Sequence, residues 1–312
     1  MSTSPQKITP CLWFDANCEE AVTFYTDIFP NSRIAHIQRY PEGMDGPMAA
    51  MAGKVLTAVF ELDGYAFQAL DGGPQFTLNP SISLMLNFDP SVDPDARVKL
   101  EAMWAQLSDG GQTFMELGEY PWSPLYGWTQ DRFGVSWQLI LSGPEGEPRP
   151  FIMPAMLFVG EVCGKAADAL ETYVDLFAES QLGMIVNYPP GMEPESSEST
   201  MFGEACLAGQ WITAMDSASN HQFGFNEAFS LSIECDTQDE IDHFYDALSA
   251  VPEAEQCGWL KDRFGVSWQV VPRQLGEFMT DPDPERTGRV MNAFMSMKKF
   301  DIAALQAAYD GE

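Results

Sequence analysis

The sequence predicts an α+β fold in which a strand–helix–strand–strand–strand (βαβββ) unit occurs four times, followed by a helical C-terminal tail. Two observations predict it: an internal duplication, and four amphipathic helix patterns that each follow an apolar strand. In the duplication, residues 127–138 read GWTQDRFGVSWQ and residues 258–269 read GWLKDRFGVSWQ, with ten of twelve positions identical. An identity of this length within one chain indicates two related halves.

The duplication also predicts the domain organisation. We expect a first domain over residues 1–145, a second over residues 150–275, and a C-terminal extension of one or two helices over residues 276–312. The segment that joins the two halves, SGPEGEPRP, is rich in Gly and Pro and is typical of a linker. Each half then contains two βαβββ units, so the chain forms a pseudo-dimer by itself, and we expect a monomer or a homodimer.

The four expected helices share one spacing, with apolar residues at i, i+3, i+4 and i+7, which gives a helix one buried side. These patterns are Ala21/Phe24/Tyr25/Ile28, Leu100/Met103/Trp104/Leu107, Leu170/Tyr173/Val174/Phe177 and Ile241/Phe244/Tyr245/Leu248. Capping-box spacing marks the start of the first helix (Asn17 and Glu20) and of the fourth (Thr237 and Glu240).

An apolar strand is expected before each helix, at residues 8–14, 82–88, 152–159 and 229–235. Three short strands are expected after each helix, and in the first unit they cover residues 33–40, 55–62 and 65–70. Two such units side by side form a curved, half-barrel sheet with its helices outside. The inner face of that sheet leaves space for a small ligand.

The repeated motif itself predicts a turn followed by a strand. Residues 131–134, Asp-Arg-Phe-Gly, favour a turn in which the glycine adopts a conformation that other residues avoid. In the strand that follows, the alternation of side chains places Trp137 and Trp268 towards the helices. The same alternation places Gln138 and Gln269 towards the cavity.

Composition excludes several classes of partner. The chain has 312 residues with 46 acidic against 16 basic side chains, a formal net charge of −30, so we expect no nucleic-acid partner and no anionic membrane partner. It has no run of 18 apolar residues that would span a membrane, and no apolar signal segment near its start. Six scattered cysteines without C-x-x-C spacing are typical of reduced thiols, which predicts a cytoplasmic protein.

Several segments together carry a resemblance to a known family. The first half contains FDANCEEAVTFYTDIF, ELDGYAFQALDGG, SLMLNF and DRFGVSWQ, and the second contains FNEAFSLSIECDTQDEIDHFYDALS and QCGWLKDRFGVSWQVVP. These resemble the PhnB-like, 3-demethylubiquinone-9 3-methyltransferase-like branch of the vicinal oxygen chelate (glyoxalase/bleomycin-resistance/dioxygenase) superfamily. The resemblance implies the paired βαβββ fold with a pocket in each half. The superfamily contains lyases, isomerases, dioxygenases, thiol transferases and drug-sequestering proteins, so the fold alone does not assign a function.

The resemblance also implies a divalent metal held by His, Glu or Gln on the first and last strands of paired units. The matching positions are Pro10 (or Leu12), Gln68, Ser83 and Gln138 in the first half, and Pro154 (or Met156), Thr213, Ser230 and Gln269 in the second. None of these is His, Asp, Glu or Cys, and neutral amides and hydroxyls are weak ligands for first-row metals. We therefore expect no metal and no cofactor.

The same polar positions are candidates for binding a small molecule. Side-chain amides and hydroxyls at Gln68, Ser83, Gln138, Thr213, Ser230 and Gln269 suit a ligand with carbonyl or hydroxyl groups, although Gln138 is equally suited to bond a neighbouring strand. The first half has the longer hairpin before its DRFG turn, with aromatic side chains that include Trp122 and Tyr126. These either line the first pocket or pack between the halves.

Two functional hypotheses follow. The first is a metal-independent small-molecule-binding protein with a pocket of neutral polar and aromatic residues. The alternative is an isomerase- or lyase-type enzyme that uses a pocket carboxylate, for which Asp15 and Glu61 are the candidate catalytic residues, and whether the chain is an enzyme stays open. Methyl transfer is not supported, because the sequence has no G-x-G-x-x-G turn of the kind that binds a methyl donor.

Overall fold

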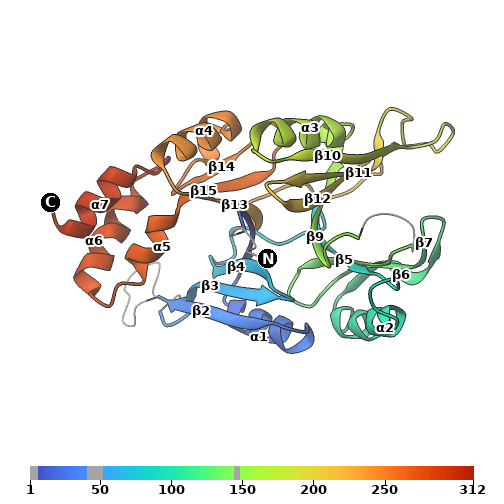
Figure 1. Cartoon of the computed structure of the whole chain (residues 1–312), viewed down its shortest axis with the longest axis horizontal. Coiled ribbons are helices and arrows are strands. Elements are labelled where there is room, and N and C mark those ends of the chain that lie inside the picture. Colours follow the sequence, from blue (N-terminus) through green and yellow to red (C-terminus); the bar gives the residue numbers. More distant parts are fainter. Residues whose placement is uncertain (1–5, 41–51, 144–147) are drawn as a thin grey trace. The chain divides into compact units, whose positions relative to one another are not determined.

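The computed structural model describes residues 6–40, 52–143 and 148–312, and the predicted βαβββ order is confirmed for the first three units (Figure 1). The first unit consists of β1 (Ile8–Phe14), α1 (Cys18–Ile28), β2 (Arg33–Arg39), β3 (Val55–Leu62) and β4 (Tyr65–Asp71). The second consists of β5 (Ile82–Phe88), α2 (Ala96–Leu107), β6 (Gln112–Tyr120), β7 (Ser123–Gln130) and β8 (Ser136–Leu141).

The third unit repeats this order and the fourth shortens it. The third consists of β9 (Ile152–Val159), the 3₁₀ turn η2 (Gly160–Val162), α3 (Ala166–Leu176), β10 (Gln181–Asn187), β11 (Thr200–Leu207) and β12 (Gln210–Ser217). The fourth consists of β13 (Phe229–Cys235), α4 (Gln238–Leu248), η3 (Pro252–Ala254), β14 (Trp259–Lys261) and β15 (Ser267–Pro272). Within these described residues, two strands follow α4 where the sequence predicted three.

Contacts divide the chain into two compact units. One is Cys11–Phe229, and the other combines Ser230–Glu312 with the residues up to Pro10.

One eight-stranded sheet lies wholly within the unit Cys11–Phe229, in the order β10-β11-β12-β9-β5-β8-β7-β6. β5 pairs antiparallel with β9, while β8 pairs parallel with β5 and β12 pairs parallel with β9. The sheet therefore joins the second βαβββ unit to the third, across the Gly/Pro linker. This corrects the expectation that the pocket of the first half is formed by its own two units.

Helices α2 and α3 cover one face of this sheet. The backbone of Gly127 in β7 packs against the ring of Trp104 in α2, and Gly203 in β11 packs against Leu170 in α3. Side chains of the opposite parity point to the other face, which we call the helix-free face. Trp137, on the helix side, is fully buried against the rings of Tyr25 and Phe29, as the sequence predicts.

The repeated DRFGVSW motif forms a turn in both copies. The carboxylate of Asp131 accepts hydrogen bonds from the backbone N–H groups of Phe133 and Val135 (2.8 and 3.1 Å), and from Trp137 Nε1 (2.7 Å). Asp262 accepts the three equivalent bonds at 2.8–3.0 Å. Gly134 and Gly265 have φ of 93° and 87°, which side chains with a Cβ avoid. The duplicated sequence is thus explained as a structural element.

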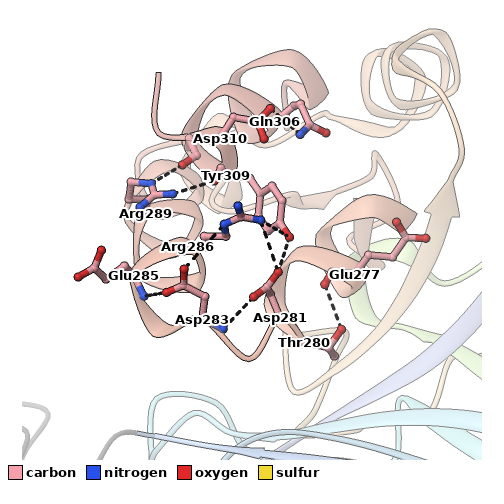
Figure 2. A network of polar contacts seen from close by, with 11 residues as sticks. Glu277, Thr280, Asp281, Asp283, Glu285, Arg286, Arg289, Gln306, Tyr309 and Asp310 are labelled. Atoms are coloured by element: carbon pink, nitrogen blue, oxygen red, sulfur yellow. Dashed lines mark hydrogen bonds and ion pairs between the residues drawn. The ribbon is translucent and has the colours of Figure 1, made fainter.

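The C-terminal tail folds into three helices, α5 (Arg273–Met279), α6 (Pro284–Met295) and α7 (Ile302–Asp310). A polar network joins them around Tyr309 (Figure 2). Arg286 Nη1 donates to the Tyr309 hydroxyl (3.2 Å), and that hydroxyl donates to Asp281, which lowers the pKa of this carboxyl. Arg289 donates to the last carbonyls of α7 at 2.8 Å. In the part of the chain that the structure describes, no helix is long and apolar enough to cross a bilayer.

Candidate ligand-binding site

Strand register places four of the candidate positions on the helix-free face of the eight-stranded sheet. Ser83 lies opposite Ser136 on β8 and opposite Ala155 on β9, and Thr213 on β12 lies opposite Ala155 from the other side. Residues directly opposite one another in paired strands point the same way. Gln138 lies two residues beyond Ser136 and shares its face. The site therefore combines Ser83 and Gln138 of the first half with Thr213 of the second.

The register also corrects two sequence-based positions on β9. Pro154 and Met156 flank Ala155 and point to the helix side of the sheet, so Ala155 is the residue that faces Ser83 and Thr213. All eight residues of β9 are buried. A strand that is apolar on both faces gives no alternation from which its parity can be predicted.

The same correction applies to β1, where Cys11 lies opposite Gln68 of β4, so Pro10 and Leu12 point to the other face. Cys11 is a buried thiol, 2% exposed. Cys is a metal-ligand type that the sequence-based assignment did not place here. One cysteine beside one amide does not make a metal site, because structural and catalytic sites need three or four strong ligands.

Two hydrogen-bonded clusters occupy the first-half side of the helix-free face. The Ser83 and Ser136 hydroxyls are 2.9 Å apart, and Trp128 Nε1 donates to Ser136 at 2.9 Å. The Tyr126 hydroxyl donates to Gln138 Oε1 at 2.9 Å, so the expected bond from Gln138 to a neighbouring strand is present. Burial raises the pKa of Tyr126 far above its usual value and keeps the phenol a neutral donor. No described residue accepts from Gln138 Nε2, which leaves its two N–H groups for other partners.

The Thr213 hydroxyl has no hydrogen-bond partner among the described residues, although the residue is fully buried. Leaving a buried polar group unpaired costs about 1–3 kcal/mol, so native proteins rarely do so without a reason. Three methionines on the same face, Met85, Met153 and Met215, have flexible side chains that can move aside for a ligand. Thr213 is therefore the residue on this face that most needs an external partner.

A half-buried ion pair beside Thr213 was not predicted from the sequence. Glu204 lies opposite Thr213 in β11, and its carboxylate binds Arg149 through two bonds of 2.7 and 3.0 Å. The Arg149 guanidinium also lies 3.9 Å from the centre of the Trp211 ring. The only signal in the sequence is a glutamate inside the apolar run TMFGEACL. The pair fixes the end of the Gly/Pro linker to β11 and β12.

The aromatic hairpin β6–β7 contributes to the site through only one of its two predicted residues. Tyr126 is 7% exposed and reaches Gln138, whereas Trp122 at the hairpin turn is 55% exposed. Trp122 stacks on Tyr120 (5.2 Å between ring centres) and meets Tyr126 edge-on (5.6 Å). Trp122 therefore supports Tyr126 from the surface and does not line the helix-free face.

Gln68 and the two candidate catalytic carboxylates lie elsewhere. Gln68 is on β4, in the order β1-β4-β3-β2, and Glu61 of β3 shares its face. Arg33 binds both carboxylate oxygens of Glu61, and this hydrogen bonding lowers the pKa of Glu61 below its usual value. Asp15 follows β1 and is exposed. A salt-bridged and an exposed carboxylate do not have the environment of a general acid or base.

Ser230 and Gln269 form a separate cluster in the other compact unit. Gln269 Nε2 donates to the Ser230 hydroxyl at 2.9 Å, and Ser230 lies opposite Ser267 in the register. The Ser267 hydroxyl is buried without a partner among the described residues. The cluster repeats the residue types of Ser83, Ser136 and Gln138 with a different hydrogen-bond pattern.

The residues on the helix-free face do not fit a divalent metal. The four positions hold a methyl group (Ala155), two hydroxyls (Ser83 and Thr213) and an amide (Gln138). Stable sites for first-row metals need imidazole, thiolate or carboxylate ligands. Over the described residues, no three or more His, Cys, Asp or Glu side chains are grouped so that they would hold a metal ion. These four positions therefore offer hydrogen bonds and no strong metal ligand.

Comparison with known proteins identifies the family to which the chain belongs. The protein-family model described as 3-demethylubiquinone-9 3-methyltransferase matches residues 6–140 and 150–271. The PhnB protein of Bacillus cereus is 37% identical over 44% of this chain and 100% of its own, with a TM-score of 0.39. Protein PA1353 of Pseudomonas aeruginosa is 24% identical over 42% of this chain and 94% of its own, with a TM-score of 0.36.

Similarity to maize glyoxalase I extends over most of the chain. It is 12% identical over 88% of this chain and 97% of its own, with a TM-score of 0.51, which shows the fold. No curated protein matches the sequence. The chain therefore has a glyoxalase-like fold and belongs to the family described as 3-demethylubiquinone-9 3-methyltransferase, of which it contains two tandem copies.

Proposed function

We propose that this chain is a metal-independent small-molecule-binding protein whose ligand is uncharged and carries carbonyl or hydroxyl groups. The observation that supports this most is the buried, unpartnered hydroxyl of Thr213 on the helix-free face. The free N–H groups of Gln138 add donors on the same face, and the methionines provide an adaptable apolar surface. A ligand oxygen that accepts from Thr213 or Gln138 removes the cost of an unpaired buried group.

The family's description names a methyl transfer, which is not part of this proposal because the sequence has no methyl-donor turn. The enzyme alternative has no specific observation in its favour, since Glu61 is salt-bridged and Asp15 is exposed. A cytoplasmic location is proposed with the binding function, because all six cysteines are unbridged thiols, which suits a reducing compartment.

A thermal-shift survey with neutral aromatic ketones, aldehydes and alcohols tests the proposal, and Thr213→Val is its decisive variant. Valine has nearly the shape of threonine but no hydroxyl. Without ligand, we expect the free energy of unfolding of T213V to be about 1 kcal/mol higher than that of wild type, because the substitution removes an unpaired buried group. The shift produced by a stabilising compound should fall in T213V.

Thr129→Val is the matched control on the same sheet, since the buried Thr129 hydroxyl donates to the carbonyl of Gln112 (3.2 Å). T129V should destabilise the protein and leave the ligand shift unchanged. A panel without a stabilising compound, or a T213V variant as unstable as T129V, contradicts the proposed site. Stabilisation that disappears with EDTA, or stoichiometric divalent metal in the purified protein, contradicts metal independence.

A further inference from the structure

A cleft of 680 Å³ lies on the outside of the compact unit Cys11–Phe229, and none of the predicted site residues lines it. Its walls come from the C-terminal end of α1, the β3–β4 turn, the end of β5, one side of α2, and the end of the linker with the residue that follows it. Helices α1 and α2 lie at the lower edge of Figure 1. The lining includes Arg149, whose partner Glu204 lies opposite Thr213, and Asn87, which shares the parity of Ser83 on β5.

The inner wall of the cleft is aromatic. Phe29 and Phe88 are 3% and 6% exposed, and Phe151 meets both of them edge-on, with ring centres 6.3 and 5.1 Å away. Met103 of α2 also lines it. Phe29 and Phe88 therefore lie behind Phe151, which is half-buried and presents its ring to the cleft. An aromatic ring of this kind binds the apolar part of a ligand, and aromatic faces attract organic cations.

The polar lining of the cleft is acidic and its cations are already paired. Lys99 binds Asp93 (2.5 Å), and Arg149 binds the buried Glu204. The carboxylates of Asp27 and Asp63 have no ion-pair partner in the part of the chain that the structure describes. Burial raises the pKa of Asp63, as expected for a carboxylate without a nearby cation.

The end of α1 adds to this negative potential. The last carbonyls of a helix have no partner within it and carry the negative end of its dipole. α1 has no basic residue in its last turn, and Asp27 occupies that turn instead. This local arrangement concentrates negative potential at the end of α1.

We propose that this cleft binds an organic cation, a protonated amine attached to an apolar and preferably aromatic body. The ammonium group lies between Asp27, Asp63 and the end of α1, and the body packs on Phe151. Both parts of the ligand are needed, because exposed carboxylates alone bind a cation weakly.

Isothermal titration calorimetry with 2-phenylethylamine tests the proposal, with 2-phenylethanol and 3-phenylpropionate as neutral and anionic analogues of the same shape. We expect the amine alone to give a saturable isotherm that weakens with added NaCl. Asp27→Asn and Asp63→Asn should each weaken it about 2- to 5-fold, the effect of one partly exposed ion pair. Ala102→Trp, at an exposed position lining the cleft, should abolish binding without affecting folding.

The third unit offers a matched control. Asp175 stands next to last in α3, as Asp27 does in α1, and α3 also has no basic residue in its last turn, but Asp175 does not line the cleft. Asp175→Asn should leave amine binding unchanged. Equal binding of the alcohol, an equal loss in D175N, or the absence of a saturable isotherm overturns the proposal. Loss of amine binding in T213V also overturns it, because the amine would then bind the helix-free face.

Discussion

Buried carboxylates in this protein act as hydrogen-bond acceptors that hold turns and rings in place. Asp131 is 4% exposed and accepts from the Tyr25 hydroxyl (2.7 Å) in addition to its three bonds within the repeated motif. Burial raises the pKa of Asp131, and the bonds from Trp137 and Tyr25 oppose that rise. The carboxylate therefore joins α1 of the first unit to β8 of the second.

Replacing Asp131 by Asn removes one carboxylate oxygen and introduces an amide donor among groups that are themselves donors. We expect D131N to lower the free energy of unfolding by at least about 2 kcal/mol, since one or more buried donors lose their acceptor. Urea denaturation followed by tryptophan fluorescence measures this. Tyr25→Phe, which removes a single donor, should cost only about 1 kcal/mol. Equal midpoints for D131N and wild type would contradict the role of the carboxylate.

At the scale of single residues, the sequence predicts local chemistry well and long-range partners poorly. The turn at residues 131–134 was predictable because Asp and Gly have fixed roles within four residues. The partner of Glu204 was not, because Arg149 is 55 residues away and depends on which strands pair. The same limit applies to the unpartnered Thr213.

The helices of the first and third units are capped from a distant strand. The N–H of Cys18 in α1 donates to Asp71 at the end of β4 (2.9 Å), and Asn17 makes no side-chain cap, contrary to the capping box predicted there. Asp216 at the end of β12 accepts from Gly164, Lys165 and Ala166 at the start of α3 (2.7–3.2 Å). The predicted cap of α4 is confirmed, because Thr237 accepts from Glu240 N–H.

Asp216→Ala should therefore weaken α3 strongly. Three backbone N–H groups at the start of α3 would lose their acceptor, and so would the backbone N–H of Thr200. We expect the free energy of unfolding to fall by about 2 kcal/mol or more. Hydrogen exchange at residues 164–166 should accelerate together with a lower urea midpoint. Asp168→Ala on the same helix, which breaks only an exposed pair with Lys165, should cost less than about 1 kcal/mol. Equal effects of the two variants would show that Asp216 is not the cap.

Element types and boundaries were predictable where periodicity is strong, as in the four helix patterns and in β3. Strand pairing between units was not, because the apolar sequences of β5 and β9 suit either neighbour. Since β9 is buried on both faces, its sequence does not indicate which of its residues face which side of the sheet. The residue of β9 on the helix-free face is therefore Ala155, one position away from the predicted Pro154 or Met156. The polar strand β8 had its parity predicted correctly through Trp137 and Gln138.

The net charge of −30 acts on the whole molecule. Many of the basic side chains already form exposed ion pairs, such as Arg97 with Glu101 and Arg39 with Glu19. Each pair of this kind contributes little to the free energy of unfolding. The remaining carboxylates repel one another, and this repulsion opposes folding.

Added salt should therefore stabilise the protein. Between about 10 mM and 300 mM NaCl, the Debye length falls from about 30 Å to about 6 Å, which screens the repulsion more than the short ion pairs. We expect the melting temperature to rise by about 2–4 °C, equivalent to ~1 kcal/mol for a chain of this size. Calorimetry measures the shift, and choline chloride should reproduce it if no specific Na⁺ site is involved. A constant or falling melting temperature would contradict net repulsion.

The antiparallel pairing of β5 with β9 has a kinetic consequence for the linker between the two family copies. Two separate chains reach such a pairing by collision, at a rate set by their concentration. Here a short segment after Leu141 leads directly into β9, so the two strands meet at an effective concentration on the order of millimolar. Cleavage of that segment would make completion of the eight-stranded sheet dependent on dilution, and it would expose the edge of β5 to other chains.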